Sequence, residues 1–253
     1  MIIDSHCHFN LSKVSPQEWI KEARNNGVNK FLNVSVDLET FPDVLNVAEQ
    51  YEEVYASVGV HPNADLHDQT TVEDLVRLSQ HSKVIAIGET GLDYYRSSGD
   101  LTWQFKRFRN HIQAAKETKK PLIIHCREAK EDVINVLREE NAKEIGGIMH
   151  CFVENWEIAQ QIMELGFLIS FSGIVTFKTA TDLQEVAQKV PANQYLIETD
   201  APFLTPLPFR GKANQPAYVK QIGEFIAALR NESLNTVAHN TTQNFLNLFQ
   251  LTA

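Results

Sequence analysis

The N-terminal stretch Met1-Ile-Ile-Asp-Ser-His-Cys-His-Phe9 joins an apolar run to two histidines separated by one residue. Positions i and i+2 of a β-strand point to the same side, so the stretch predicts a strand that presents His6 and His8 together at its end. Histidine is a common metal ligand, but many His-x-His pairs are ordinary surface residues at strand ends. The pair therefore indicates a metal site only if distant parts of the chain supply further ligands.

Seven further short apolar runs alternate with stretches of helical periodicity along the chain. Runs that are apolar on both faces are typical of parallel strands covered on both sides. The strands that we expect cover residues 2–6, 30–36, 54–60, 84–89, 121–125, 147–150, 167–171 and 195–199.

Helical signals fill the connections between these runs. Ser15-Pro-Gln-Glu18 is a capping box with proline at the first helical position, and Gly27 closes the helix that follows. An apolar stripe at helical spacing marks the fourth connection and consists of Phe105, Phe108, Ile112 and Ala115.

This regular alternation predicts an α/β fold, a (β/α)8 TIM barrel. The chain has 253 residues and no linker, low-complexity tract or charge block, so we expect a single domain over residues 1–253. A doubly wound open sheet is the alternative. It is disfavoured because no glycine-rich phosphate loop follows any of the expected strands.

Composition and charge narrow the class of protein. Hydrophobic residues make up 43% and charged residues 22%, as in soluble globular proteins. No apolar run approaches a membrane span, the N-terminus lacks the basic start of a signal peptide, and three cysteines make no disulfide framework, so we expect a cytoplasmic protein. The net charge of −9 argues against a broad basic surface for duplex DNA, but not against a phosphorylated substrate held by metal ions in a small cleft.

Chemistry-bearing residues gather at the carboxyl ends of the expected strands, where TIM barrels carry their active sites. Five of the nine histidines fall there, together with two acids: His6, His8, His61, His125, His150, Glu89 and Asp200. The other histidines lie in apparent loops and helices, and we expect structural or solvent-exposed roles for His67, His81, His111 and His239.

Four of these histidines and both acids, crowded on one rim, would repel one another and lose solvation unless cations lay between them. Six ligands suit two ions better than one, and Glu89 is the best candidate to bridge them. We expect one ion to take His6, His8, Glu89 and Asp200, and the other to take Glu89, His125 and His150. His61 would then support a ligand or contact the substrate, because the other residues already fill both positions.

Three cysteines directly follow proposed histidine ligands. If the strand alternation persists, the thiols of Cys7, Cys126 and Cys151 point away from the metals and pack toward the helices.

Taken in order, these motifs resemble those of the TatD family of metal-dependent hydrolases. The resemblance runs from residue 3 to about residue 216, and the C-terminal helices also look alike. The motifs are Ile3-Asp-Ser-His-Cys-His8, Gly59-Val-His-Pro62, Ile87-Gly-Glu-Thr-Gly-Leu-Asp-Tyr94, Pro121-Leu-Ile-Ile-His-Cys-Arg127, His150-Cys-Phe152, Ser170-Phe-Ser-Gly173, Glu198-Thr-Asp-Ala-Pro202 and Arg210-Gly-Lys-Ala-Asn-Gln-Pro216.

The resemblance implies a TIM barrel of the metal-dependent hydrolase type that cleaves ester bonds, notably phosphodiesters in DNA. It places two divalent ions on His6, His8, Glu89, His125, His150 and Asp200. Mixed histidine and carboxylate ligands suit Zn, Mn, Fe or Ni, and Mg if the affinity is weak. Asp200 and Glu89 would form the catalytic pair, with Asp200 accepting the proton of the attacking water. The expected partner is nucleic acid as substrate, single-stranded DNA ends above all, with no membrane and no obligate protein partner.

Several residues near these motifs are expected to contact the substrate. Arg127 would hold a phosphate or form an ion pair with Glu198. Arg210, Lys212 and Asn214 supply polarity suited to a nucleotide phosphate, and an ordinary solvated loop is the competing interpretation. For Asp93 and Tyr94 a loop-ordering role is at least as probable as direct catalysis.

Two other functions stay open at this point. In the first, the protein uses the same metal ions to cleave a carboxylic ester, as an aminoacyl-tRNA deacylase does. In the second, it is a metal-binding scaffold that catalyses no reaction.

Overall fold

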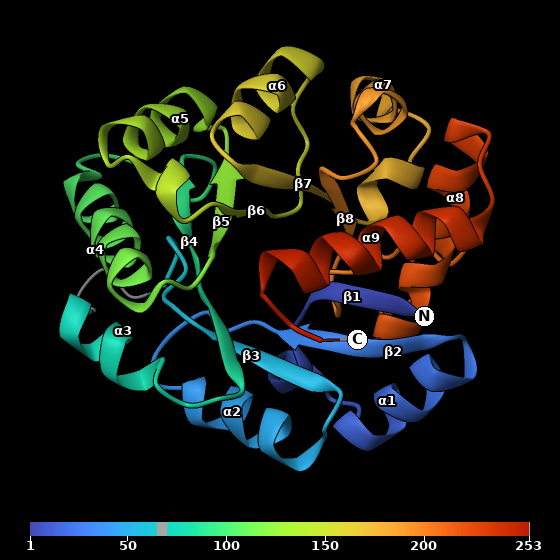
Figure 1. Cartoon of the computed structure of the whole chain (residues 1–253), viewed down its shortest axis with the longest axis horizontal. Coiled ribbons are helices and arrows are strands. Elements are labelled where there is room, and N and C mark those ends of the chain that lie inside the picture. Colours follow the sequence, from blue (N-terminus) through green and yellow to red (C-terminus); the bar gives the residue numbers. More distant parts are fainter. Residues whose placement is uncertain (65–69, 253) are drawn as a thin grey trace.

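A computed structural model describes residues 1–64 and 70–252 of the chain, and its strands form a nearly closed barrel (Figure 1). Within these residues eight parallel strands pair in sequence order from β1 to β8. They are β1 (Ile2–Cys7), β2 (Val28–Asn33), β3 (Val54–Val58), β4 (Val84–Asp93), β5 (Leu122–Arg127), β6 (Gly147–Met149), β7 (Phe167–Phe171) and β8 (Tyr195–Ile197). The predicted (β/α)8 barrel is confirmed, and the doubly wound alternative is wrong.

Helices follow the strands and surround the barrel (Figure 1). In the described part of the chain the α-helices are α1 (Pro16–Asn25), α2 (Phe41–Gln50), α3 (Val72–Leu78), α4 (Thr102–Thr118), α5 (Lys130–Glu139), α6 (Trp156–Glu164), α7 (Thr181–Lys189), α8 (Val219–Arg230) and α9 (Leu234–Leu248). Short 3-10 turns are η1 (Phe9–Leu11), η2 (Ala142–Glu144), η3 (Gly173–Thr176) and η4 (Pro216–Tyr218). None of the described helices combines the length and apolar character needed to cross a bilayer.

The barrel closes through the residues that follow β8. Cys7 and Ala201 form a parallel bridge, and the N–H of His8 donates to the carbonyl of Ala201 at 2.9 Å. The N–H of Asp200 donates to the carbonyl of His6, also at 2.9 Å. Closure therefore places Asp200 beside His6 of β1 and His8, which directly follows β1, although β8 itself ends at Ile197 rather than at residue 199 as predicted.

Strand β4 continues beyond Glu89, where the prediction ended it, because its pairing with β5 continues. Gly91 lies opposite His125, and Asp93 lies opposite Arg127. A Cβ atom at Gly91 would come within 2.0 Å of the carbonyl oxygen of His125. Glycine thus permits the close approach of β4 and β5 next to the site.

Two apolar cores support this frame. The larger core packs the outer faces of the strands against the helices. The smaller core gathers strand residues such as Ile3, Ile123 and Leu196, together with Phe245 of α9 and Phe249, which directly follows that helix. Together they hold the strand ends, and hence the site residues, on a rigid base.

Both helical predictions are confirmed. Ser15 caps α1 by accepting a hydrogen bond from the N–H of Glu18, and Gly27 has a positive φ of 82° after the helix. In α4 the residues Phe108, Ile112 and Ala115 are fully buried.

We expect Ser15→Ala to lower the free energy of unfolding by about 1 kcal/mol, because the N–H of Glu18 loses its acceptor. Ser98→Ala is the matched control, since Ser98 is exposed in a loop and its loss should stay within about 0.5 kcal/mol. Urea unfolding followed by circular dichroism measures both. Equal stability of the two variants would refute a capping role for Ser15.

Candidate metal centre

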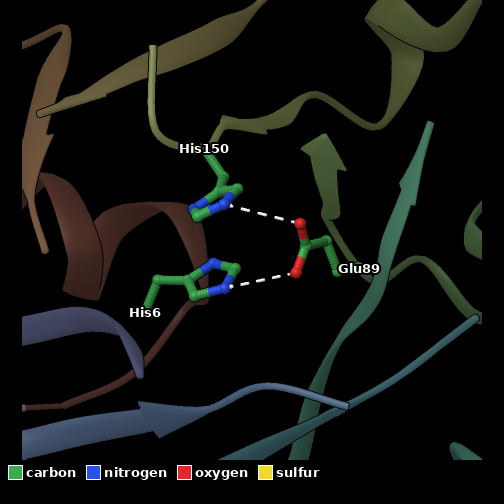
Figure 2. Close-up of side chains that lie close together, drawn as sticks. All are labelled: His6, Glu89 and His150. Carbon is green, nitrogen blue, oxygen red and sulfur yellow. Dashed lines mark ion pairs between the residues drawn. The ribbon is translucent and has the colours of Figure 1, made fainter. Parts of the chain in front are cut away.

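The carboxylate of Glu89 lies at the centre of the site and is only 3% exposed. Its Oε2 atom lies 3.4 Å from Nε2 of His6, and its Oε1 atom lies 3.4 Å from Nε2 of His150 (Figure 2). Oε1 also lies 3.0 Å from Nδ1 of His125. The two oxygens of one carboxylate therefore face different sets of histidines.

Asp200 lies beside the two N-terminal histidines, His6 and His8. Its Oδ1 atom lies 3.3 Å from Nε2 of His8 and 3.7 Å from Nε2 of His6. The Nε2 atoms of His6 and His8 are 3.2 Å apart. His6, His8 and Asp200 form one group whose ligand atoms all lie within 4.8 Å of one another, and His6, Glu89 and His150 form another.

The positions bring the predicted ligands together, and the division into two ion sites stays a prediction. Oε2 of Glu89 lies near His6, and Oε1 lies near His125 and His150. The group of His6, Glu89 and His150 contains residues from both predicted ion sites, and His61, Glu89 and His125 form a further group. Imidazole and carboxylate donors at this spacing are a suitable ligand set for first-row divalent metals. Without a cation, no partner within the described residues hydrogen-bonds Nδ1 of His6, which is buried.

A cavity of about 520 Å³ opens over these residues. The proposed ligands His8, Glu89, His125, His150 and Asp200 contribute to its lining. Around them the wall is mixed, since it includes Arg96, Arg127, Tyr95 and Phe203. A substrate in this cavity would touch the metal ligands, guanidinium groups and aromatic rings at once.

In three proposed histidine ligands one ring nitrogen lies toward the centre of the site and the other, the far nitrogen, points away from it. Each far nitrogen faces a hydrogen-bond acceptor. Nδ1 of His8 donates to the carbonyl of Val34 at 2.9 Å, and Nδ1 of His150 lies 2.7 Å from Oε1 of Glu198. In a neutral ring, each acceptor favours a proton on the far nitrogen, which leaves Nε2 of His8 (facing Asp200) and Nε2 of His150 (facing Glu89) with a free lone pair. These histidines are therefore prepared to bind cations.

Asp93 supplies the third acceptor, to His125. Nε2 of His125 lies 3.0 Å from Oδ2 of Asp93, whose carboxylate also accepts from the side chain of Asn63 and from the N–H of Arg96. Nδ1 of His125 is then the nitrogen that faces Glu89. Of the two roles left open for Asp93, loop ordering and direct catalysis, these contacts favour loop ordering, and they add the orientation of a proposed ligand.

His61 differs from these histidines in the polarity of its far nitrogen. Its Nδ1 accepts a hydrogen bond from the N–H of Asn63 at 2.9 Å, so the proton of the neutral ring resides on Nε2. That Nε2 lies 3.2 Å from Nδ1 of His125 and 3.5 Å from Oε1 of Glu89. His61 therefore presents a donor to the site, whereas a metal ligand must present a lone pair.

The pKa values follow from burial and from opposite charges. Burial raises the pKa of Glu89, but the surrounding histidines outweigh it and hold that pKa well below its usual range. Burial lowers the pKa of His150, but Glu198 and Glu89 together raise it to about 10. Burial lowers the pKa of His61 to about 3. The carboxylates are thus charged, and His61 is neutral at physiological pH.

Comparison with known proteins identifies the family of the chain. The family model described as TatD related DNase matches residues 3–250. The chain belongs to the TatD family of metal-dependent hydrolases. It is 43% identical to the uncharacterized metal-dependent hydrolase YabD of Bacillus subtilis, over 99% of this chain and all of that protein. It is 40% identical to the uncharacterized metal-dependent hydrolase YcfH of Escherichia coli K12, over 100% of this chain and 97% of YcfH.

A solved TatD structure confirms the fold. The crystal structure of YjjV, a TatD homologue from Escherichia coli K12, superposes with a TM-score of 0.92 at 29% sequence identity. The match covers 99% of this chain and 98% of YjjV. The TatD barrel thus extends over the whole chain.

The residues predicted to contact the substrate differ in their position relative to the cavity. Arg127 is exposed at the cavity wall, where its guanidinium lies 5.0 Å from the centre of the Tyr95 ring. Glu198 is occupied by Ser170, the N–H of Cys151 and His150. The alternative of an Arg127–Glu198 ion pair is therefore wrong.

Two other predicted contacts lie away from the cavity wall. The guanidinium of Arg210 lies 4.2 Å from the centre of the Phe177 ring. Asn214 is 1% exposed and donates to the carbonyls of Thr199 and Phe203. Asn214 therefore holds the loop that carries Asp200, and its position does not support direct contact with a substrate.

The cysteines only partly follow the strand alternation. Cys7 is buried in the core, as predicted, and its thiol donates to the carbonyl of Leu32. Cys126 packs against the core and also borders the cavity. Cys151 lies beyond the end of β6 with a positive φ of 44°, and it lines the cavity, contrary to the prediction. Burial raises the pKa of its thiol well above the usual value, so it is a neutral group there.

The remaining histidines serve other parts of the molecule. His111 is buried in α4 and accepts from the N–H of Val60. His81 lies 3.1 Å from the carboxylate of Glu49. His67 lies outside the described residues. The two aromatic residues at the cavity, Tyr95 and Phe203, carried no sequence signal because single exposed aromatics have no periodicity.

We expect Asp93→Asn to weaken metal binding about tenfold, because an amide cannot accept from His125, Asn63 and Arg96 together. Calorimetric titration of metal-stripped protein with Zn or Mn measures the affinity. Asp74→Asn, which changes an exposed acid paired with Arg77, is the control. An Asp93→Asn variant that binds metal as the wild type does would exclude the orienting role.

Proposed function

We propose that this TatD protein is a metal-dependent phosphodiesterase that degrades DNA from single-stranded ends, with two divalent ions in the site. The observation that carries the proposal is the carboxylate of Glu89, whose two oxygens face separate groups of histidines at the floor of one cavity. The family's description as related to DNases supports the choice of a phosphodiester. Two cations held by these residues would suit a substrate that carries negative charge.

Asp200 is the residue that we assign to accept the proton of the attacking water. It lies in the segment after β8 that closes the barrel against β1. Its side chain is 14% exposed and lines the cavity. His8 and the other histidines hold its pKa low against the effect of burial, so the carboxylate is charged and able to accept. Divalent ions bound here would supply Lewis acidity, which acidifies water and neutralises charge on a phosphate.

His61 has a different proposed role from that of Asp200, because it presents an N–H group to the cavity. Its Nε2–H points at Nδ1 of His125, and a cation on that lone pair would leave the His61 proton without its acceptor. A phosphate oxygen in the cavity is the natural replacement. We therefore assign His61 as a hydrogen-bond donor to the substrate, and Arg127 as the planar cation that binds a phosphate further out.

The acidic surface agrees with a small, local binding site. A net charge of −9 gives no long-range attraction for a duplex. Arg96 and Arg127, both exposed at the cavity wall, supply positive charge where the phosphates would lie. Affinity for the substrate would then depend on the metals and on these few contacts.

We expect wild-type protein that has been stripped of metal and resupplied with Mg, Mn or Zn to shorten a 5′-labelled single strand stepwise. Glu89→Gln should lose this activity on the order of a thousandfold, because an amide cannot serve both groups of histidines. Glu164→Gln, a change at an exposed acid near the end of α6, should cleave as the wild type does. Gel electrophoresis of the products measures the ladder and its polarity.

An uncut strand with every metal, from protein shown to hold metal, would exclude the nuclease. A carboxylic ester such as aminoacyl-tRNA would then be the next substrate. Failure with both substrates would leave a metal-binding scaffold without turnover.

His61→Leu should leave the metal content unchanged and lower kcat about a hundredfold, because a donor is lost while the ligands remain. His61→Gln, which keeps an N–H, should recover part of the rate. Metal analysis beside steady-state kinetics measures both, with His150→Leu as the variant that loses metal. Loss of metal from His61→Leu would identify His61 as a ligand instead.

A further inference from the structure

Exposed apolar side chains gather at the mouth of the cavity. Among the described residues, the large apolar side chains that are exposed are Met1, Leu11, Val14, Tyr95, Phe203 and Leu207. Leu11, Tyr95 and Phe203 all line the cavity above Glu89. Tyr95 is 63% exposed and Phe203 is 51% exposed. Clustered exposure of this kind marks a binding surface, whereas scattered single residues do not.

The two rings stand on opposite sides of the site. Tyr95 follows β4, and Phe203 follows β8, which lies across the barrel from β4 in the strand order. The centre of the Phe203 ring lies 6.4 Å from that of His8. A flat group that entered the cavity would therefore meet an aromatic ring on either side of the proposed metals.

Cationic groups accompany these rings. The guanidinium of Arg127 lies 5.0 Å from the centre of the Tyr95 ring, an arrangement that holds two planar groups together while leaving Tyr95 exposed. Arg96, the next residue after Tyr95, is also exposed at the cavity wall. Aromatic rings interleaved with guanidinium groups suit a ligand that alternates flat bases with phosphates.

We propose that Tyr95 and Phe203 form a stacking subsite for unpaired nucleobases that flank the phosphate at the metal centre. The inference rests on the proposed function and names the feature of the substrate that is recognised. Bases in a duplex are stacked and paired, so only a single strand or a frayed end offers free faces to these rings. The pair thus selects single-stranded nucleic acid without reading its sequence.

A second copy of this chain is the competing occupant of the same rings. It is disfavoured because each copy carries a net charge of −9, and the rings lie at the entrance to a charged cavity rather than on a continuous apolar face. Nucleic acid instead brings phosphates to Arg96 and Arg127. Charge therefore favours the nucleobase.

The test compares two single strands of the same length, one intact and one with tetrahydrofuran abasic residues at both ends. The wild type should cleave the abasic strand with a KM about tenfold higher. Tyr95→Leu and Phe203→Leu should raise the KM for the intact strand by a similar factor and lose the preference for it. Tyr95→Phe should keep the preference, and so should Leu207→Ala, which changes an exposed residue away from the cavity lining.

The possible outcomes test the stacking subsite and the proposed nuclease activity separately. Equal KM values for both strands in the wild type, or wild-type KM values in both leucine variants, overturn the subsite and leave the nuclease proposal intact. If the wild type cuts neither strand, the nuclease proposal fails, and fluorescence anisotropy of the same labelled strands decides the subsite alone. Tighter binding of the intact strand, lost in the leucine variants, supports stacking, and equal or absent binding overturns it.

Discussion

The buried carboxylate of Glu89 is the constraint on which the rest of the site depends. A charge that is 3% exposed is costly unless opposite charge lies beside it. Here imidazoles from β1, β5 and the end of β6 surround it, together with His61 after β3. One side chain of β4 thus ties distant strands together, and either protons or cations must accompany it. The charges of Glu198 and Glu89 raise the pKa of His150 to about 10, so a proton on its ring would balance the carboxylate where no cation is bound.

Polar groups behind the histidines decide on which ring nitrogen each neutral imidazole carries its proton. Val34, Asp93 and Glu198 each accept from, or lie against, the far nitrogen of one histidine. Because an imidazole has one proton when neutral, fixing it on the far side leaves the near side free to bind a cation. The backbone N–H of Asn63 does the reverse for His61. Residues equally near the centre are therefore separated into ligands and a donor by atoms that lie behind them.

Much of this site was predictable from the sequence, because a parallel barrel sends every strand end to the same rim. Glu89, His125 and His150 could be placed together on that basis alone. Side-chain direction beyond the strand ends was less predictable. Asp200 was placed correctly beside His6 and His8. Cys151 was not, because its positive φ breaks the alternation that predicts side-chain direction. The burial of Asn214 and the partners of Glu198 depend on loop packing, for which the sequence has no periodic signal.

The distribution of charge is compatible with the proposed action of this acidic protein on an acidic polymer. A basic surface would bind duplex and single strand alike, with little regard to the ends. A deep cluster of histidines and carboxylates would instead concentrate positive charge only where cations bind, and the guanidinium groups of Arg96 and Arg127 would extend it a short way along the wall. Under the proposed function, attraction would begin only when a strand end has entered the cavity. Discrimination between single strands and duplexes would therefore depend on contacts with the cavity wall. The flat, exposed side chains of the wall, rather than the net charge of the protein, would select the substrate.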